Sequence, residues 1–509
     1  MSTARPLRLK TEEVARPDKT IAEVFPIARL WVDNSLSHLD GTYDYLVPQR
    51  LDSSVKAGVR VGVDFAGREV EGLVLERLDA TSFAGLKMIS SVLSPVVVAP
   101  PQLISLIKAS SKRWLAHPYD IIRSAIPPRV ASVDKDVAES QIDSPGKSRS
   151  TREISYIHIQ PSENAIAKIA EFAQAKLKLG SVLLIVPEER ELIRLAELLG
   201  DSATVLSASL SRSDRYRNYL KTLQQGDLVV LGTRSSVFAP LSDLAEIILV
   251  DDSSESYYEQ RSPGWNARDV AALRSQMGSI SFTIMGYSPS VEVARLIETG
   301  LMKYQPVKAS LPVKSYQATS GELLPAGIFS PIRSALKKGP VLFIAPRKGY
   351  SQSILCSQCR NVSLCECGGR VLQRGAGRVI ECSICQKSYP DWTCTWCQSQ
   401  KFFLIGRGSE RFAQEIGRAF PGFAVTESSG ERILDKYLLN DGIVISTPGA
   451  IPKSPEGYSA VVILECERLF SQADVRSQER ARGILFSSAG SLASGSQLLL
   501  VISHNHPVL

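Results

Sequence analysis

The chain has 509 residues, of which 44% are hydrophobic and 22% charged, and its formal net charge is +7. This length exceeds what one core usually holds, and the composition argues against disordered and fibrous classes. So mild a charge excess permits an acidic partner such as nucleic acid without requiring one. No apolar run approaches the ~20 residues that span a bilayer. Residues 1–24 form a polar tail without the apolar segment of a signal peptide, so we expect a flexible tail on a cytoplasmic protein with no membrane partner.

Short alternating stretches follow between residues 25 and 94. They are rich in β-branched and aromatic residues and are separated by Gly, Pro and Asp turns, which is typical of a small β-rich domain. These stretches are IARLWVD, GTYDYLVP, GVRVGVDF and EVEGLVLERLD. Residues 95–130 then show helical periodicity between prolines, which predicts a short helical, winged-helix-like segment.

Residues 131–152 are polar and lack periodicity, which predicts a linker. Gly146-Lys147-Ser148 resembles the end of a phosphate loop, but Gln141 stands where the motif G-x-x-x-x-G-K-[ST] has its first glycine. A phosphate loop also needs an apolar strand before it and a helix after it, so that backbone N–H groups converge on the phosphates. Charged residues precede this segment and the strand-like ISYIHI follows it, so we interpret it as linker.

Helical and strand patterns alternate over residues 153–310, and again over residues 311–349 and 406–509. The alternation predicts an α/β fold with parallel sheets, in two lobes. Expected strands include SVLLIVP, DLVVLGT and AEIILVDD in the first lobe, and PVLFIAP, GIVISTP and AVVILECE in the second. Residues 350–405, which are rich in cysteine, interrupt the second lobe.

Eight of the nine cysteines lie between Cys356 and Cys397. They form four close pairs, as expected of knuckles that each present two thiolates to a tetrahedral metal, and two zinc ions would use all eight. The pairs are Cys356 with Cys359, Cys365 with Cys367, Cys382 with Cys385, and Cys394 with Cys397. Disulfides are the alternative, which a reducing cytoplasm disfavours. Cys466 lies in the apolar stretch VVILEC and is expected to be a buried hydrophobic residue.

Cations and aromatic residues surround the cysteine pairs. A zinc ion held by four thiolates carries a net charge of about −2, so the cations are expected to balance it, and a DNA contact is their alternative role. The cations are Arg360, Arg370, Arg374, Arg378 and Lys387. The aromatic residues Trp392, Trp396, Phe402 and Phe403 could stack on bases, but in so small a module they more often form the core.

The order of these segments resembles the PriA family of replication-restart helicases over nearly the whole sequence. The motifs that carry the resemblance are the interleaved cysteine pairs, GTRSSVFAPL (232–241), SPGWNARDVA (262–271) and TYDYLVP (42–48). It implies two RecA-like helicase lobes, the second containing an inserted two-zinc module, preceded by a β-rich domain that binds a DNA 3′ end.

The resemblance also implies how the cysteines share two zinc ions. One ion would take Cys356, Cys359, Cys394 and Cys397, and the other Cys365, Cys367, Cys382 and Cys385. The pair Cys365-Glu366-Cys367 has one spacer residue where the family usually has two. We therefore expect the second site to be distorted or weaker.

The family's ATPase motifs are eroded in this chain. Where the phosphate loop belongs, ENAIAKIAEFAQAKLKLG has no glycine-rich turn with a lysine, so a triphosphate would lose its main clamp. The family's D-E-E-H motif is replaced by Asp251-Asp252-Ser253-Ser254 in this chain. Its S-A-T-P-S motif matches only the last residues of GYSPS. A-G-R-A-G-R becomes AGSLAS at 489–494, without the arginines that would reach a γ-phosphate. We expect no catalytic residues, and neither ATP nor Mg²⁺ as a cofactor.

Two groups of residues match DNA-binding motifs of the family. Thr233, Arg234 and Ser235 match a motif that touches the single-strand backbone, so Arg234 could bind phosphate. The second group, which resembles the family's pocket for a 3′ end, comprises Tyr43, Asp44, Tyr45, Gly67 and Lys87. Tyr43 would be a base-stacking platform. The alternative is that both tyrosines are strand residues of a small core.

The leading hypothesis is a DNA-binding replication-restart protein of the primosome, which recognises stalled or forked DNA and recruits other restart factors without helicase activity. Its partners would be forked or single-stranded DNA and other primosome proteins, at the nucleoid in the cytoplasm. An ATP-dependent 3′→5′ helicase with an unorthodox nucleotide site is the alternative, and a degenerating, redundant chain is a third hypothesis.

The five histidines show no spacing typical of metal ligands or of a catalytic triad, so we assign none of them a catalytic role. They are His38, His117, His158, His504 and His506.

Overall fold

The computed structural model describes most of the chain, and its residues group into two compact units. One unit comprises residues 1–154, 169–250 and 254–283, and the other comprises residues 155–168, 251–253 and 284–509. The described residues are 20–34, 36, 38–137, 152–161, 163–307, 311–318, 322–345, 352–359, 361–373, 379–405, 409–430, 432–470 and 475–509. Most of the tail, Gln141, and the Gly146-Lys147-Ser148 segment lie outside them.

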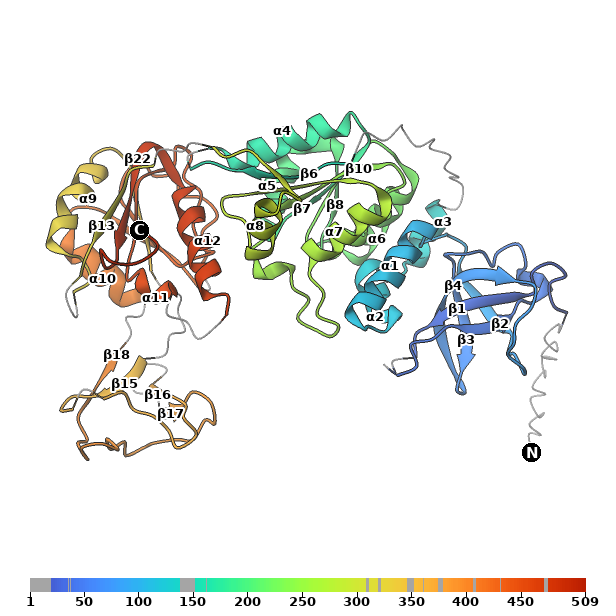
Figure 1. Cartoon of the computed structure of the whole chain (residues 1–509), viewed down its shortest axis with the longest axis horizontal. Helices are drawn as coiled ribbons and strands as arrows, with labels where there is room; N and C mark the ends of the chain where they lie inside the picture. Colours follow the sequence, from blue (N-terminus) through green and yellow to red (C-terminus); the bar gives the residue numbers. More distant parts are fainter. Residues whose placement is uncertain are drawn as a thin grey trace, which may run out of the picture. The chain divides into compact units, whose positions relative to one another are not determined.

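The N-terminal domain is a five-stranded antiparallel sheet of strand order β2-β1-β4-β3-β5 (Figure 1). The strands are β1 (Ile27–Val32), β2 (Tyr43–Leu46), β3 (Arg60–Phe65), β4 (Arg68–Leu78) and β5 (Ile89–Ser94). Branched residues on their inner faces, among them Leu30, Val61 and Val74, form its core. Ala66 and Gly67 join β3 to β4 with φ of 51° and 79°, as a two-residue hairpin turn of the mirror-image type requires.

Two helices that begin with proline follow this sheet. They are α1 (Pro101–Trp114) and α2 (Pro118–Ala125), and no strand lies within residues 95–130, all of which are described. The segment expected to be a linker starts as α3 (Ala131–Val137). Asp134 explains this difference, because its buried carboxylate pairs with Arg129 and accepts a hydrogen bond of 2.7 Å from the Tyr216 hydroxyl. Polar residues that bury their side chains in this way give no periodic apolar signal.

The first lobe is built on a seven-stranded sheet of order β12-β6-β11-β10-β7-β9-β8. Its strands are β6 (Ile154–His158), β7 (Ser181–Ile185), β8 (Ala203–Leu206), β9 (Val229–Gly232), β10 (Leu244–Val250), β11 (Ser281–Gly286) and β12 (Lys303–Tyr304). Its helices are α4 (Ala165–Leu177), α5 (Glu189–Leu199), α6 (Arg212–Gln224), α7 (Ala267–Gly278) and α8 (Val291–Glu298), with 3₁₀ turns that include η3 (Arg234–Phe238) and η4 (Glu255–Tyr257). β7 and β9 are buried along their whole length, which explains their continuous apolar sequences.

The second lobe has six strands in the order β13-β22-β21-β14-β20-β19, and every neighbouring pair is parallel. The strands are β13 (Val313–Tyr316), β14 (Val341–Ile344), β19 (Val425–Ser428), β20 (Ile443–Ser446), β21 (Tyr458–Ile463) and β22 (Leu492–Val501). The helices are α9 (Phe329–Leu336), α10 (Ser409–Ala419), α11 (Glu467–Phe470) and α12 (Ser477–Ala489). Two cores line the sheet, and Cys466 is fully buried in one of them, which confirms its predicted hydrophobic role.

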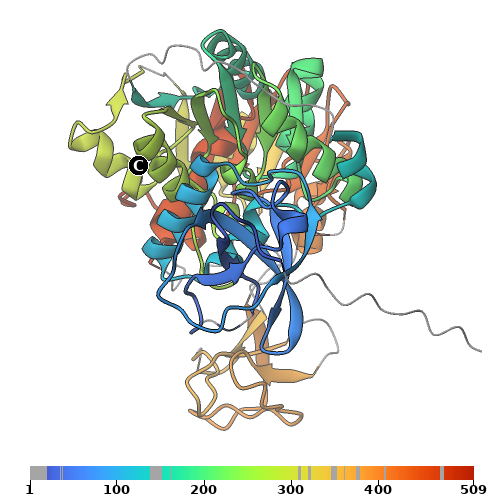
Figure 2. The ribbon, with the colours of Figure 1, turned by 90° about the vertical axis from the view of Figure 1, so that its right-hand side faces the viewer.

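The cysteine module lies between β14 and α10 in sequence, and Figure 2 shows its short strands joined by long loops. Its antiparallel sheet has the order β17-β16-β15-β18. The strands are β15 (Gln352–Cys356), β16 (Val371–Gln373), β17 (Ile380–Cys382) and β18 (Phe402–Ile405). Cys356, Cys365, Cys382 and Cys394 are buried in its core, so the module's interior consists largely of cysteine.

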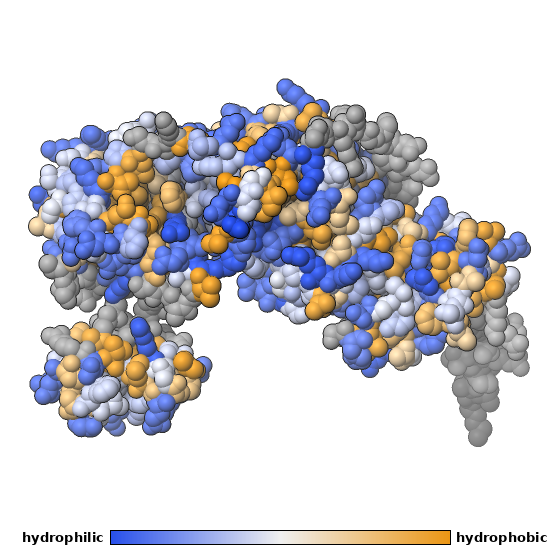
Figure 3. Space-filling model, viewed as in Figure 1, coloured by the Kyte–Doolittle hydropathy of each residue, from blue (hydrophilic) through white to orange (hydrophobic). Residues whose placement is uncertain are grey.

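These elements confirm the predicted fold class: an α/β chain with two lobes built on parallel sheets, a cysteine module inserted in the second lobe, and a β-rich domain before them. Among the described residues, no helix is both long and apolar enough to cross a membrane. The face drawn in Figure 3 mixes hydrophilic and hydrophobic residues on the described surface.

Candidate functional site

A pocket of about 260 Å³ opens beside the ends of β2 and β3 in the N-terminal domain. Four of the five residues predicted to hold a 3′ end line it, and the loop after β4 completes it. The lining residues are Thr42, Tyr43, Asp44, Tyr45, Asp64, Phe65, Ala66, Phe83, Gly85, Leu86 and Lys87. Gly67 is not among them; it lies in the β3–β4 turn next to Ala66 and donates its N–H to Asp64 at 3.0 Å.

The two tyrosines of this pocket differ in burial. The Tyr43 ring is half-buried and packs edge-to-face against Phe65, with the centroids 5.0 Å apart. Tyr45 is buried in the core of the domain, and its hydroxyl donates to the carbonyl of Asp64 at 3.0 Å. Burial raises the pKa of Tyr45 to about 12. Tyr45 therefore behaves as the predicted alternative, a core residue, while the Tyr43 ring is accessible from the pocket.

Asp44 is held from two sides. Arg29 donates to both carboxylate oxygens, from Nε at 2.9 Å and from Nη2 at 3.0 Å, and the Thr81 hydroxyl donates at 2.6 Å. Burial alone would raise the pKa of Asp44, but the hydrogen bonds from Arg29 and Thr81 outweigh it and hold the pKa below its usual value. The side chain is therefore a fixed, ionised acceptor at the pocket.

Lys87 contributes a positive charge whose partner is nearby. Its Nζ lies 2.5 Å from Asp64 Oδ1, and both side chains are about half exposed. Lys87, together with the N–H of Gly67, lowers the pKa of Asp64. Because an exposed ion pair is worth little, a phosphate could replace Asp64 as the partner of Lys87.

The cysteines gather into two clusters with the same membership as the predicted nested sets. Within each cluster the four Sγ atoms lie within 4.8 Å of one another. Adjacent sulfurs are separated by 3.4 and 3.6 Å in both clusters, whereas tetrahedral zinc with Zn–S bonds of about 2.3 Å requires about 3.8 Å. Each cluster could therefore hold one metal ion. The short Cys365–Cys367 spacer does not prevent closure, since the sulfur separations of the two clusters match.

Glycines and tight turns explain how the shortened pair fits. A methyl group on Gly369 would lie 2.6 Å from the Cys382 sulfur, and Gly368 has a φ of +83°. The Tyr389 hydroxyl, followed by the backbone N–H of Cys367, lowers the pKa of Cys365 to about 6. At the first cluster the backbone N–H of Cys359 has the largest such effect and lowers the pKa of Cys356 to about 6. The backbone N–H groups of Lys387 and Ser399 favour the thiolates of Cys385 and Cys397, but the neighbouring sulfurs and burial outweigh them and raise both pKa values to about 12. Each cluster therefore combines a thiolate with a thiol, and binding of a metal would release the thiol proton.

The aromatic residues of the module divide between core and surface. Trp392 is buried, donates from Nε1 to the Ser363 hydroxyl at 2.7 Å and packs edge-to-face on Phe402. Trp396 is 69% exposed, which leaves its ring available to a partner. Lys387 pairs with Glu366 at 3.0 Å beside the second cluster. Arg370 is exposed, and Arg360, Arg374 and Arg378 lie outside the described residues.

Arg234, which was predicted to contact DNA, forms hydrogen bonds and an ion pair within its own lobe. Its guanidinium donates to the carbonyls of Ser256 at 3.2 Å and Tyr258 at 2.5 Å, and pairs with Glu259 at 3.0 Å. These bonds tie η3 to the segment that follows VDDSSES. Thr233 and Ser235 are partly exposed on either side of it.

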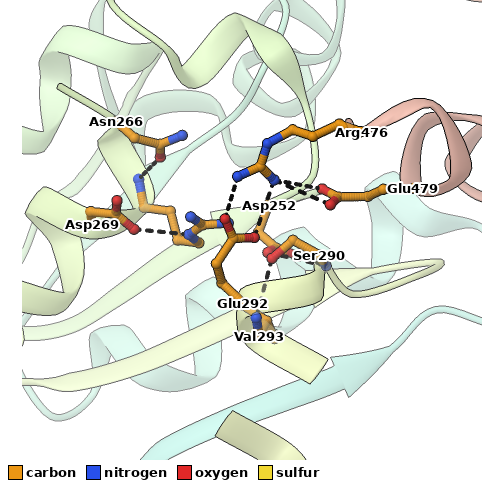
Figure 4. A network of polar contacts seen from close by, with 9 residues as sticks. Asp252, Asn266, Asp269, Ser290, Glu292, Val293, Arg476 and Glu479 are labelled. Atoms are coloured by element: carbon orange, nitrogen blue, oxygen red, sulfur yellow. Dashed lines mark hydrogen bonds and ion pairs between the residues drawn. The ribbon is translucent and has the colours of Figure 1, made fainter. Parts of the chain in front are cut away.

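The segment that replaces D-E-E-H packs against the start of α8. The buried Asp252 carboxylate accepts from the Ser290 N–H at 3.2 and 3.3 Å, and the Ser290 hydroxyl in turn caps α8 by accepting from Val293 N at 3.2 Å. Figure 4 shows this contact near Arg476, which extends between Glu292 and Glu479. In this arrangement Asp252 stabilises a helix N-terminus.

The connection from β6 to α4 is a strand–loop–helix, the arrangement that surrounds a phosphate in nucleotide hydrolases. Here a carboxylate occupies the loop. Glu163 accepts from the Gln160 N–H at 2.8 Å and from Lys168 Nζ at 2.7 Å, and Lys168 also donates to the His158 carbonyl at 3.2 Å. Burial would raise the pKa of Glu163, but the bonds from Lys168 and Gln160 lower it. The Glu163 carboxylate is thus the anion that the Gln160 N–H and the Lys168 ammonium bind in this loop.

Comparisons with known proteins show which family this chain belongs to. A family model described as the PriA "3'DNA-binding domain (3'BD)" matches residues 30–127. "Probable replication restart protein PriA" of Mycobacterium tuberculosis (strain ATCC 25618 / H37Rv) is 33% identical over 495 residues, which cover 88% of this chain and 75% of that protein. The chain belongs to the PriA replication-restart family. The protein of the same name from Mycobacterium leprae (strain TN) is 31% identical over 499 residues, which cover 88% of this chain and 76% of that protein.

Among solved structures, that of RecG bound to a three-way DNA junction matches this PriA-family chain with 11% identity and a TM-score of 0.37. The match covers 80% of this chain and 48% of RecG.

Several residues of the PriA-family pocket could not be selected from the sequence. Arg29 and Thr81 orient Asp44, and Phe83, which is 58% exposed to solvent, adds a ring to the lining of the pocket. An apolar aromatic residue in the polar, turn-rich stretch DATSFAGLK is the one signal that could have pointed to Phe83. No sequence pattern indicated Arg29, because its role depends on its pairing with Asp44 across two neighbouring strands.

Proposed function

We propose that this PriA-family chain recognises forked or single-stranded DNA with an exposed 3′ end and recruits other replication-restart proteins without unwinding DNA. The observation that carries the proposal is the Asp44 carboxylate, which Arg29 and Thr81 fix at a pocket of about 260 Å³. Because the Asp44 side chain has no exposed surface, a sugar hydroxyl would have to replace the Thr81 hydroxyl as its donor, whereas a phosphate would be repelled. Since only the terminal nucleotide of a strand carries a free 3′-hydroxyl, this acceptor favours a strand end over a continuous strand.

The other pocket residues supply contacts that any terminal nucleotide can make. The Tyr43 ring, held by Phe65, and the exposed Phe83 ring offer stacking surfaces, and stacking is worth ~1–3 kcal/mol per base. Lys87 would give up its ion pair with Asp64 and pair instead with the phosphate next to the terminal nucleotide. Because none of these contacts reads a base edge, we expect recognition of structure rather than of sequence.

We further propose that each cysteine cluster holds one zinc ion. One ion would be bound by Cys356, Cys359, Cys394 and Cys397, and the other by Cys365, Cys367, Cys382 and Cys385. Zinc in such closed tetrahedral sites stabilises the fold rather than supplying catalysis. In a module whose interior is largely cysteine, the metal would maintain the surface that presents Trp396 to DNA or to a restart protein.

The absence of helicase activity is supported by the β6–α4 loop. Glu163 already satisfies the Gln160 N–H and the Lys168 ammonium, so a triphosphate would have to displace a carboxylate and would also be repelled by it. Arg476 is engaged by Glu292 and Glu479, so carboxylates of the chain already balance its charge. The lobes would then act as a scaffold that contacts the DNA backbone through Thr233 and Ser235, at the nucleoid.

The test combines binding and hydrolysis with the purified full chain. Fluorescence anisotropy should give a higher affinity for a fork with an exposed 3′-hydroxyl end than for a blunt duplex of equal length. In the same preparation, forked DNA with Mg²⁺ and ATP should give no phosphate release above background. Equal affinity for both DNAs would contradict the pocket. DNA-stimulated hydrolysis that Asp251→Ala abolishes would instead establish the alternative, an ATP-driven 3′→5′ helicase.

A further inference from the structure

A second cavity, of about 440 Å³, lies in the first unit where α1 meets the first lobe. Its walls come from the start of α1, the end of α6, η3, the loop before β10 and the end of α7. Most of the lining is apolar and includes Leu103, Leu106, Leu223, Phe238 and Met277. This size and character are typical of small-molecule sites, and neither the 3′-end pocket nor the cysteine clusters include any of these residues.

One charge interrupts the apolar lining. Of the described residues that line the cavity, Arg274 alone is charged. Its Nη1 and Nη2 donate to the backbone carbonyls of Val237 and Ala239, each at 2.7 Å. In the part of the chain that the structure describes, no carboxylate forms an ion pair with it. Although burial lowers the pKa of Arg274 to about 10, the guanidinium remains protonated at neutral pH.

Arg274 is partly exposed and so keeps part of its hydration, but a cation at an apolar wall that is balanced only by carbonyl dipoles still lacks an opposite charge. A ligand with one negative charge would restore that balance. Its remainder would have to be apolar, since the leucines and Phe238 offer no hydrogen bonds. A highly charged ligand such as a nucleotide would bring more negative charge than one guanidinium neutralises.

We propose that this cavity binds a small organic monoanion, with its carboxylate or sulfonate at Arg274 and an apolar body against Leu103, Leu106 and Phe238. Arg274 donates two of its five N–H groups to these carbonyls, which leaves donors for the ligand. Because α1 forms one wall, and α7 with η3 the other, a bound ligand joins the helix that follows the 3′-end domain to the first lobe. Binding therefore raises the stability of this junction.

Octanoate and its neutral counterpart 1-octanol are suitable probes, because they differ mainly in charge. Calorimetric titration of the full chain should show one saturable octanoate site, with octanol binding about 10-fold or more weakly. Arg274→Gln keeps an amide donor for the carbonyls but removes the charge, so it should abolish the preference for octanoate. Ser105→Trp, at the rim contributed by α1, should fill the cavity and reduce binding of both probes at least 10-fold.

Two variants serve as matched controls: Arg217→Gln removes an exposed arginine of α6, and Lys108→Trp places a ring on α1 away from the cavity. Both should bind octanoate as the unmodified chain does. Equal affinity for the two probes, no saturable site for octanoate, or an octanoate preference that survives Arg274→Gln would each overturn the proposal. If Arg274→Gln does not fold, the comparison of probes and the Ser105→Trp variant still decide.

Discussion

Arg29 and Asp44 face each other as register partners on the antiparallel strands β1 and β2, and the guanidinium contacts both oxygens of the carboxylate, at 2.9 and 3.0 Å. The Asp44 side chain has no exposed surface, while that of Arg29 is 30% exposed. The arginine therefore fixes the direction of the carboxylate and keeps it ionised. This pair makes the proposed selection of a 3′-hydroxyl end testable.

The first prediction concerns the acceptor itself. Asp44→Asn should lower the affinity for a fork with a 3′-hydroxyl end about 10-fold, because an amide accepts a weaker hydrogen bond than a carboxylate and also turns a donor toward the pocket. Anisotropy titrations with forked and blunt DNA measure the effect. Glu76→Gln is the control, since Glu76 also contacts Arg29, at 3.3 Å, but is 53% exposed and does not line the pocket. Similar losses in both variants would assign Asp44 a general electrostatic role.

The second prediction varies the DNA. A fork that ends in a 3′-phosphate should bind at least about 10-fold more weakly than one that ends in a 3′-hydroxyl, because two negative charges would meet at Asp44. In Asp44→Asn this difference should shrink. A pocket that binds both ends equally well would show that the terminal hydroxyl does not reach Asp44.

The third prediction follows from the lowered pKa of Asp44. Because the folded-state pKa lies below the unfolded value of about 3.9, the Arg29–Asp44 pair stabilises the fold above that value. The stabilisation disappears as the pH falls through the lower, folded pKa. Asp44→Asn should therefore lower the free energy of unfolding equally at pH 7 and pH 5, and by less at pH 3, below the unfolded pKa. Urea unfolding at the three pH values measures this, and a destabilisation that already fades between pH 7 and pH 5 would contradict it.

The fourth prediction concerns metal content. Freshly purified, reduced protein should contain two zinc ions per chain, and a chelator should first remove the ion at Cys365, Cys367, Cys382 and Cys385. Cys367 and Cys385 are exposed, whereas each cysteine of the other cluster is buried or partly buried. Gly369→Ala should lower the content to about one ion by pushing a methyl group onto the Cys382 sulfur. Gly417→Ala, whose methyl group would make an ordinary 3.6 Å contact with Val425, should retain both ions in elemental analysis.

The fifth prediction separates two roles of Arg234. Its loss would remove one donor each from the carbonyls of Ser256 and Tyr258 and from Oε2 of Glu259. Arg234→Ala should lower the free energy of unfolding by about 1–3 kcal/mol, with little change in single-strand affinity. Arg261→Ala, an exposed arginine in the adjacent segment, should be neutral for stability. Reduced DNA affinity with unchanged stability would support the phosphate contact predicted from the motif.

The amino-acid sequence by itself determined the local elements. Strands such as SVLLIVP and DLVVLGT, and the knuckles around Cys382 and Cys394, could be recognised because their signals come from neighbours a few residues apart. The motifs also indicated the family, and with it the nested cysteine sets. Asp44, Tyr43 and Lys87 were selected for the pocket from the same resemblance.

Contacts between distant residues were decided only by the tertiary structure. The partners of Asp44 are 15 and 37 residues away in the chain, and strand register brings them together. Helix α3 forms because Asp134 reaches Tyr216, 82 residues away, and Arg234 is engaged by a loop that its motif does not contain. The cavity at Arg274 exists because α1 packs on α7. Periodicity records which face of an element is apolar, whereas the partner of a polar side chain depends on how separate elements pack.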